Sequence, residues 1–289
     1  MAIIVNMACG LANRMFQYSY YLYLRKFGYD ARIDYYTSAK LDHERVAWNR
    51  IFPKASYRKA TIWDLVKTGG GDSLLSKVRR KYLNSMCNVR YLKAFEAPLP
   101  DKHEKTLYMM GVFQNAGVVE SVDQLVREAF SFKPFSDERN LSLMQEMQGN
   151  CSVAIHVRKG KDYTNISYYK DTCPVEYYFK AVEYIKDRVH NPQFYVFTDN
   201  AEWVKENFTD FPYVLVKGNP VTGWGSHFDM QLMSLCSHNI ISNSTYSWWG
   251  AYLNKNPNKI VILPNAWFNP GSCDAFDSAA VKCKHWVAL

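Results

Sequence analysis

Short apolar runs alternate with longer amphipathic stretches from the first residues of the chain onward. Residues 3–7 form an apolar run that meets a glycine-containing loop, and a pattern rich in Tyr, Phe and Leu then continues to Phe27 and ends at Gly28. A second apolar run follows at residues 31–35. A short buried run, a helical period and another short run predict a strand, a helix and a strand, so the chain is expected to open on a βαβ unit.

The alternation becomes regular in the second half of the chain. Residues 107–113 predict a strand and residues 118–130 and 136–147 predict helices, the last closing at Gly149 and Asn150, whereas residues 40–95 carry no assignable pattern. Beyond them, strands are predicted over residues 152–158, 193–198, 213–216, 239–242 and 259–263, with helices over 174–188, 201–208, 227–237 and 246–254. Five short apolar runs separated by helical segments predict a parallel, doubly wound sheet.

The glycine and asparagine at residues 149–150 are therefore taken as the domain boundary. This divides the chain into residues 1–150 and residues 151–289, two α/β domains of nearly equal length. Open α/β sheets bind ligands outside the carboxyl ends of their strands, so we expect a ligand cleft between the two domains that faces these ends.

Composition excludes several classes of protein. Hydrophobic residues make up 48% and charged residues 21% of the 289 positions, which fits neither a disordered nor a fibrous chain. The seven cysteines are scattered with no C-x-x-C pair, so neither a disulfide framework nor a zinc site is indicated and a reducing cytoplasm is the expected location. No basic segment precedes the first apolar run and no run reaches about 18 apolar residues, so neither a signal peptide nor a membrane span is expected.

The net charge of +8 suits an anionic partner. Residues Lys77 to Lys93 carry six basic side chains and no acidic one. This stretch is either a solvated helix face or loop, or a surface that makes peripheral contact with anionic lipid or substrate. A nucleic-acid partner is not expected, because no helix-turn-helix, RNA-recognition or zinc-finger pattern occurs.

The first candidate site follows the strand predicted at residues 152–158. Alternation along this strand puts His156 and Arg158 on the same face, and a glycine-containing turn comes next. A guanidinium presents a fixed fork of donors that matches phosphate oxygens, so Arg158 is a candidate to clamp a diphosphate and to stabilise a leaving group that gains negative charge. The alternative is a surface turn with ordinary salt bridges.

The second candidate site lies between the strand at residues 239–242 and the following helix. Asn243, Ser244 and Thr245 stand at the predicted N-terminus of that helix. Hydroxyl and amide side chains there cap free N–H groups, and the same N–H groups bind phosphate. The number of polar residues exceeds what a cap needs, which favours anion binding. Trp248 and Trp249 lie inside the helical pattern and are expected to pack in the core.

Two further segments hold candidate residues. Asp199 ends the strand at residues 193–198, where its carboxylate either accepts hydrogen bonds from a nucleotide base or ribose or belongs to a helix N-cap formed with Thr198 and Asn200. Gly10, in the first loop, allows close backbone approach. The dinucleotide and P-loop glycine patterns are absent.

No metal site or hydrolase nucleophile is indicated. The seven histidines show neither H-x-x-x-H nor H-E-x-x-H spacing, and no Asp-x-Asp pair occurs. The chain also lacks the G-x-S-x-G motif of a serine hydrolase.

Taken in this order, the clusters resemble the bacterial and animal α-1,2-fucosyltransferases, glycosyltransferase family 11. Residues 10–18 resemble its G-G-L-G-N-Q-M-F-Q-Y motif, residues 111–114 its G-Y-F-Q, residues 156–160 its H-x-R-R-G-D-Y, residues 229–250 its N-S-[ST]-[FY]-S-W-W block and residues 264–267 its P-x-x-W. The chain departs from the family at four positions: Cys9 and Ala12 replace glycines, Arg14 replaces a glutamine, and Lys161 stands where the family has the aspartate that here follows as Asp162.

The resemblance implies a GT-B fold, in which an N-terminal acceptor domain and a C-terminal domain that binds GDP-fucose without a metal face each other, and it implies inversion at the anomeric carbon. Arg158 would bind the donor diphosphate. His156 and Asp199 would meet the guanine, and Asn243, Ser244 and Thr245 would line the phosphates. Gly10 and Asn13 would shape the donor side from the other domain.

The resulting hypothesis is transfer of L-fucose from GDP-fucose to the 2-hydroxyl of a terminal galactose, on an acceptor such as a lipid-linked bacterial surface polysaccharide of the O-antigen type. The general base is Asp162 or, alternatively, a phosphate oxygen of the donor. The competing hypotheses are a transferase of the same fold with another acceptor, linkage or GDP-sugar, and a sensor that binds the sugar nucleotide without turning it over.

Overall fold

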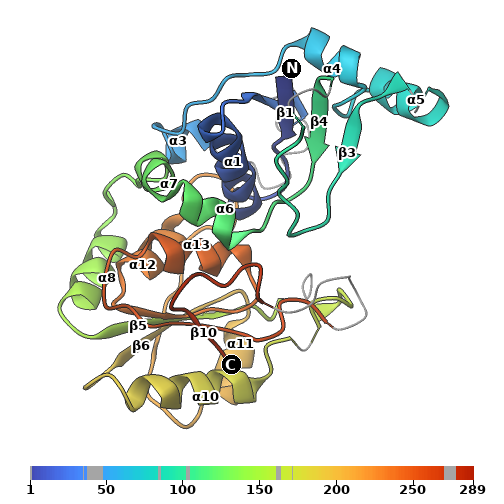
Figure 1. Ribbon diagram of the computed structural model, residues 1–289. Coiled ribbons are helices and arrows are strands. Elements are labelled where there is room, and N and C mark those ends of the chain that lie inside the picture. The colour runs from blue at the N-terminus through green and yellow to red at the C-terminus, as the bar shows by residue number, and fades with distance from the viewer. Residues whose placement is uncertain are drawn as a thin grey trace. The chain divides into compact units, whose positions relative to one another are not determined.

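The computed structural model describes residues 2–34, 36–37, 48–83, 86–101, 105–160, 164–170, 172–269 and 278–289. The chain forms two compact units: Met1–Phe132 together with Thr222–Trp224, and Lys133–Val221 together with Gly225–Leu289. Each unit contains a parallel sheet, of four strands in unit 1 and six in unit 2 (Figure 1). The α/β class with two parallel sheets, expected from the sequence, is confirmed.

The sheet of unit 1 has the order β2-β1-β4-β3, with β1 at Ala2–Asn6, β2 at Asp30–Asp34, β3 at Val89–Tyr91 and β4 at Leu107–Met110. The predicted βαβ opening is confirmed, because helix α1 (Leu11–Lys26) connects β1 to its neighbour β2. Helices α6 (Ala116–Ser121) and α7 (Asp123–Ala129) pack against α1. The sequence predicted one helix here, but Val122 has φ −120° and ψ 24°, outside helical geometry, and divides it.

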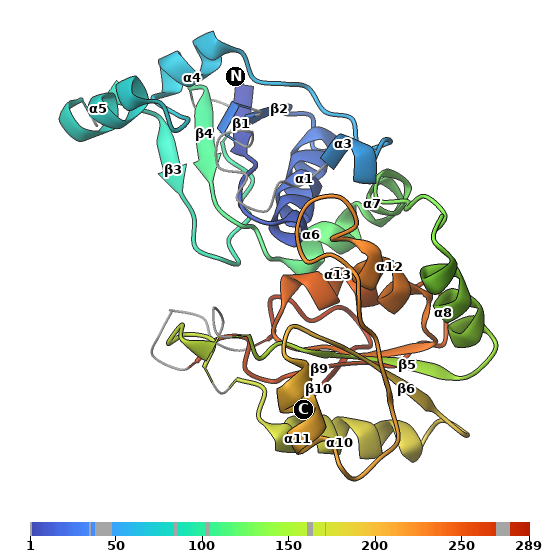
Figure 2. The same cartoon turned by 180° about the vertical axis from the view of Figure 1, so that it is seen from behind.

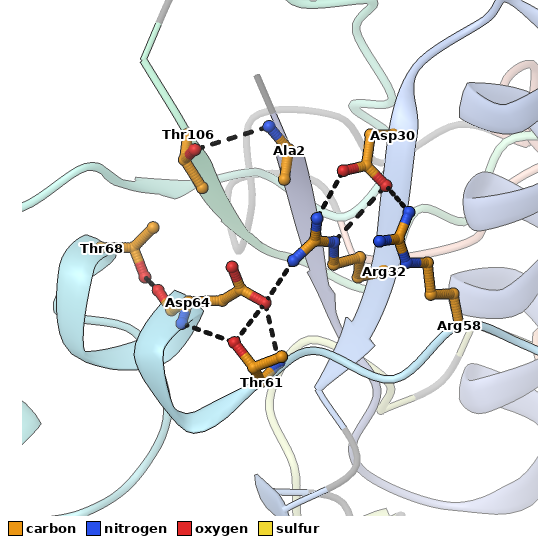
Figure 3. A network of polar contacts seen from close by, with 8 residues as sticks. All are labelled: Ala2, Asp30, Arg32, Arg58, Thr61, Asp64, Thr68 and Thr106. Atoms are coloured by element: carbon orange, nitrogen blue, oxygen red, sulfur yellow. Dashed lines mark hydrogen bonds and ion pairs between the residues drawn. The ribbon is translucent and has the colours of Figure 1, made fainter.

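Three helices of unit 1 lie in the stretch that the sequence left unassigned: α3 (Trp48–Ile51), α4 (Ile62–Thr68) and α5 (Leu74–Tyr82). A capping box begins α4, in which the Thr61 hydroxyl accepts from the Asp64 N–H and the Asp64 carboxylate accepts from the Thr61 N–H at 2.7 Å. The same carboxylate binds the Arg32 guanidinium of β2 at 2.7 Å (Figure 3). Polar contacts therefore fasten α4 to the sheet.

The sheet of unit 2 has the order β10-β9-β8-β5-β6-β7. Its strands are β5 (Ser152–Val157), β6 (Gln193–Thr198), β7 (Val214–Leu215), β8 (His238–Ile240), β9 (Val261–Leu263) and β10 (Val287–Ala288). Helices α10 (Val175–Lys186) and α11 (Ala201–Asn207) cover one face, and α8 (Glu138–Gln148), α12 (Phe228–Leu235) and α13 (Thr245–Leu253) cover the other (Figures 1 and 2). The predicted doubly wound sheet is confirmed, and among the strands of the described residues only the short edge strand β10 was not expected.

Helix α8 belongs to unit 2, whereas the sequence predicted a domain boundary after it, at residues 149–150. The change of unit falls at Phe132 because α8 packs on α12, and the Gln231 side chain of α12 donates to the carbonyl of Lys133 at 2.8 Å. The rings of Phe135 and Phe228 are also in contact, with centroids 5.6 Å apart.

The core of unit 2 includes both tryptophans of the segment at residues 242–250. Trp248 and Trp249 are fully buried, which confirms the expectation that they pack in the core. Helices α12 and α13 approach closely at Gly250, where a Cβ atom would lie 2.9 Å from the Met233 Cβ. Among the described residues, no helix is long and apolar enough to cross a membrane.

Candidate functional site

Three of the predicted clusters follow neighbouring strands of unit 2. The chain runs outward from β5 to β6 and β7 and then returns to β8, on the other side of β5. The connections therefore change direction between β5 and β8, which is where open α/β sheets bind ligands. Arg158 follows β5, Asp199 follows β6 and Ser244 follows β8, so the fold places their backbones at adjacent strand ends.

A buried hydrogen bond spans this change of direction. The Nδ1 atom of His156, on β5, lies 2.8 Å from the Ser242 hydroxyl, which follows β8. The Tyr246 ring of α13 lies nearby, with its centroid 6.0 Å from that of the imidazole. Burial, with a smaller contribution from the positive charge of Arg158, lowers the pKa of His156 to about 3. The imidazole is therefore neutral at working pH, and it offers a hydrogen-bonding group rather than a charge.

The shifted pKa of His156 makes the stability of the fold depend on pH. Its folded-state pKa lies below the unfolded value near 6.5, so the unfolded chain binds the proton first as the pH falls. As the pH falls from 6.5 to 3, we expect this residue to lower the free energy of unfolding by up to about 1.4 kcal/mol per pH unit. Urea titrations across this range are expected to give a shallower pH dependence for His156→Gln.

The matched control for this measurement is His190→Gln, which changes an exposed histidine of the same unit. The slope is expected to differ more between wild type and His156→Gln than between wild type and His190→Gln. Equal slopes for wild type and His156→Gln would contradict the assignment of a buried neutral imidazole.

The turn after β5 is organised by Asp199. One carboxylate oxygen of Asp199 accepts from the N–H groups of Lys159 and Gly160, at 2.7 and 2.9 Å. The other oxygen lies 3.9 Å from Nε of Arg158, and both side chains are about one third exposed. Asn200, rather than Asp199, caps α11 by accepting from the Trp203 N–H at 3.1 Å. The carboxylate thus holds the turn and faces the guanidinium.

The segment after β8 leads directly into α13. Ser244 occupies the N-cap position, yet its side chain makes no capping bond to the helix. Asn243 is buried, donating to the Trp267 carbonyl at 3.0 Å and accepting from the Cys173 thiol at 3.4 Å, while Thr245 is half-exposed. The absence of a Ser244 cap is consistent with the anion-binding interpretation, because a helix N-terminus attracts negative charge. Asn243 holds the loop.

The first loop of unit 1 follows β1, a central strand that lies between β2 and β4. The buried Gln17 side chain accepts from the Ala8 N–H and donates to the Gly111 carbonyl, both at 2.9 Å. The Gln114 amide donates to the side chain of Asn13 at 3.2 Å. The segments after β1 and β4 are therefore joined by two glutamines that were not among the predicted site residues.

Two of the residues that depart from the family pattern in this loop, Cys9 and Arg14, contact each other. Cys9 has φ 71°, in the left-handed region that favours glycine, and its carbonyl accepts from Nε of the buried Arg14 at 2.7 Å. Gly10 begins α1 in an extended conformation, with its carbonyl accepting from the Arg14 N–H. The positive charge that Arg14 adds to this loop is therefore bound to a carbonyl of the loop itself.

Asp162 and Lys161 lie outside the described residues, so the position of the expected carboxylate base is not described. Within the described ranges, no group of three or more His, Cys, Asp or Glu side chains is arranged to hold a metal ion.

Comparisons with known proteins identify the family. The model of glycosyl transferase family 11 matches residues 81–289, which is well over half of the chain. The chain belongs to glycosyl transferase family 11. The family resemblance drawn from the motifs is therefore confirmed, and the protein is a glycosyltransferase.

The family 11 protein is similar to two bacterial relatives and to one solved structure. It is 26% identical to the alpha-1,2-colitosyltransferase of Escherichia coli over 99% of this chain and 98% of that protein. It is 34% identical to the O-antigen biosynthesis glycosyltransferase WbnK of Escherichia coli, over 55% of this chain and only 55% of that protein. The structure of the alpha-1,6-fucosyltransferase NodZ soaked with GDP-fucose matches with a TM-score of 0.51 and 14% identity, covering 87% of this chain and 92% of that one. This match confirms the expected GT-B fold.

Proposed function

We propose that this family 11 protein transfers L-fucose from GDP-fucose to the 2-hydroxyl of a terminal galactose, with inversion at the anomeric carbon and without a metal ion. The observation that carries the proposal is the placement of three motif segments at the adjacent ends of β5, β6 and β8, where the sheet connections reverse. Unit 2 accordingly binds the donor, and unit 1 supplies the acceptor specificity.

The departing GDP gains negative charge as the glycosidic bond breaks. Arg158 is proposed to bind its diphosphate, because a guanidinium stays charged and pairs with two phosphate oxygens. The N-terminus of α13, with Ser244 and Thr245, is proposed to bind the same diphosphate through its first N–H groups. Asn243 contributes by holding this loop through its contact with Trp267.

The nucleobase is proposed to lie against β5 and β6. His156 remains a candidate for a guanine contact, and its neutrality suits a hydrogen bond to an uncharged base. For Asp199, the two backbone N–H bonds support a positioning role toward the turn that follows Arg158, alongside the guanine contact that the motif implies. Gly10 and Asn13 are proposed to take part in donor binding from unit 1.

The proton of the acceptor hydroxyl needs a base. Asp162 is one candidate, and the alternative is a phosphate oxygen of the donor. The two are distinguished by Asp162→Asn, which is expected to abolish turnover in the first case and to leave most of it in the second.

Mass spectrometry of reaction products tests the proposal directly. The protein is incubated in EDTA with GDP-fucose, GDP-mannose or UDP-galactose and a panel of β-galactosides that includes lactose. A fucosylated product formed only from GDP-fucose is expected, with linkage analysis giving position 2 of galactose. Hydrolysis of GDP-fucose without a fucosylated product would support GDP-fucose as the donor and would exclude the β-galactosides of the panel as acceptors. Neither product nor hydrolysis would favour a non-catalytic sensor.

A second candidate donor is favoured by the relative that matches along the full length, since that protein is named a colitosyltransferase. Colitose is L-fucose without the 3-hydroxyl group. Including nucleotide-activated colitose in the donor panel separates the two, because a site that hydrogen-bonds the 3-hydroxyl discriminates strongly against the sugar that lacks it.

A further inference from the structure

Helices α4 and α5 of unit 1 turn most of their apolar side chains outward. Leu65 of α4 is half-buried instead and packs against the core cluster of Ile4, Ala60 and Tyr108. Trp63 is 72% exposed and Leu75 is 80% exposed. The side chains that these helices bury are polar instead: Asp64 and Thr68 from α4, and Ser76 from α5. We name the exposed apolar side chains of the two helices the α4–α5 face; it comprises Ile62, Trp63, Val66, Leu74, Leu75, Val78 and Tyr82.

The helical period explains this arrangement. At 100° per residue, Leu74, Val78 and Tyr82 fall within one sector of α5, while Ser76 and Arg80 fall on the opposite side. An amphipathic helix of a globular unit ordinarily directs the apolar sector toward the core. Here the polar sector packs inward, so the amphipathicity of α5 is inverted with respect to unit 1.

Hydrogen bonds hold both helices in this orientation. Figure 3 shows the polar side of α4 bound to the sheet through Asp64 and Arg32. On α5, Arg80 donates to the carbonyls of Gly69 and Gly71, and Arg79 donates to the carbonyls of Val66 and Met86. Arg79 and Arg80 of the basic stretch are therefore bound to carbonyls of the chain itself, and these bonds fix the outward orientation of the apolar sector.

The apolar exposure is concentrated in this part of the molecule. Of the eighteen large hydrophobic side chains found exposed in the described residues, ten lie between Ile62 and Tyr91. Helix α5 lies beside β3, at the margin of the sheet away from α1, in both views (Figures 1 and 2). A concentration of this size marks an interaction surface more often than scattered exposure does.

Positive charge surrounds the apolar sector. Lys67 on α4 and Lys77 and Lys81 on α5 are exposed, and Lys77 also contacts Asp72 at 2.8 Å. No acidic residue occurs from Lys77 to Lys93. Trp63 and Tyr82 add the amphipathic rings that are enriched at membrane interfaces. Leucine and valine side chains rimmed by lysines match a bilayer with anionic headgroups, since the apolar side chains enter the acyl boundary and the ammonium groups meet the phosphates.

We propose that the α4–α5 face docks the protein on an anionic lipid bilayer, with α4 and α5 lying in the interface. This proposal adopts one of the two interpretations that the sequence left open for the basic stretch, peripheral contact with anionic lipid. Lys77 and Lys81 contact the lipid headgroups, the apolar sector inserts, and Arg79 and Arg80 hold the helices in place. This proposal concerns unit 1 alone and does not depend on the sugar donor or acceptor.

Vesicle sedimentation with the full chain tests it. Vesicles of phosphatidylcholine alone and of phosphatidylcholine with one quarter phosphatidylglycerol are compared at 50 and 300 mM NaCl. Binding to the anionic vesicles is expected, and it should weaken with salt. Leu75→Gln with Tyr82→Gln is expected to lower the partition coefficient at least tenfold, as is Lys77→Glu with Lys81→Glu, because each pair removes one of the two contributions to interfacial binding.

Matched pairs elsewhere on the chain provide the controls. Leu125→Gln with Val221→Gln removes two other exposed apolar side chains, and Lys255→Glu with Lys282→Glu makes the same change in net charge. Both control pairs are expected to bind like the wild type. The absence of binding to anionic vesicles would overturn the proposal, as would equal losses in the control pairs, which would indicate a general charge effect.

Fluorescence distinguishes insertion from adsorption. Trp63 is far more exposed than the core tryptophans Trp248, Trp249 and Trp267. Vesicles that contain brominated lipid are therefore expected to quench part of the emission of the wild type, and this part should be lost in Trp63→Phe. Sedimentation without any quenching would overturn the insertion of α4.

Discussion

Replacing Arg158 with alanine is expected to lower kcat/KM for fucose transfer by about a thousandfold while the protein stays folded. The residue directly follows β5 at the reversal of the sheet connections, and its side chain is one third exposed beside Asp199. Losing one well-placed donor to a developing anion costs roughly 10² to 10³ in rate, and a guanidinium supplies charge in addition. Steady-state kinetics with GDP-fucose provide the measurement, and thermal unfolding checks the fold.

Three variants make this result specific. Arg158→Lys keeps the charge but loses the planar fork, so it is expected to fall between wild type and alanine. Arg188→Ala removes an exposed arginine that stacks on Tyr184 and should leave transfer unchanged. If a donor phosphate acts as the base, Asp162→Asn loses far less activity than Arg158→Ala. Near-normal turnover by Arg158→Ala, with GDP still bound, would exclude Arg158 from the reaction.

Replacing Trp248 with alanine is expected to lower the free energy of unfolding of unit 2 by about 4 kcal/mol, the middle of the range for a large aromatic side chain in a core. Trp248 is fully buried and stacks on Tyr252, with ring centroids 4.9 Å apart, and its indole N–H donates to the Val281 carbonyl at 2.6 Å. The substitution leaves both a cavity and an unsatisfied carbonyl. Urea unfolding followed by circular dichroism measures the loss.

Trp63→Ala is the matched control, because it makes the same chemical change at an exposed position. Without vesicles it is expected to change the free energy of unfolding by less than about 0.5 kcal/mol. Trp248→Phe keeps most of the buried volume and should cost less than the alanine variant. A cost for Trp248→Ala as small as that for Trp63→Ala would contradict its place in the core.

The sequence alone was sufficient for the second half of the fold. Strands β5, β6, β7, β8 and β9 and the helices between them were all predicted, with differences of a few residues at their ends. Their apolar runs are short and separated by clear helical periods, and both signals are local. The candidate segments followed from the same pattern, because polar residues at the carboxyl ends of parallel strands stand out against buried neighbours.

The region of α4 and α5 shows why the hydrophobic periodicity did not predict the elements of residues 40–95. A helical period reveals that a helix has an apolar side, but it does not say which side the rest of the chain covers. On α4 the choice is made by Asp64, whose partner Arg32 lies on β2, thirty-two positions earlier in the sequence. Such a contact exists only once β2 and α4 have been brought together.

What the sequence by itself determined was the α/β class, the family and the polar segments at strand ends, because composition, periodicity and motif order are properties of neighbouring residues. What only the tertiary structure decided was the chemistry of individual side chains. His156 became neutral because burial removed its solvent, with a smaller contribution from the charge of Arg158. Ser242, 86 positions away, became its hydrogen-bond partner. The Asp199 carboxylate binds the N–H groups of the turn after β5 because parallel pairing sets β5 beside β6. Desolvation and long-range contacts arise only from packing, and they set the charge and orientation on which function depends.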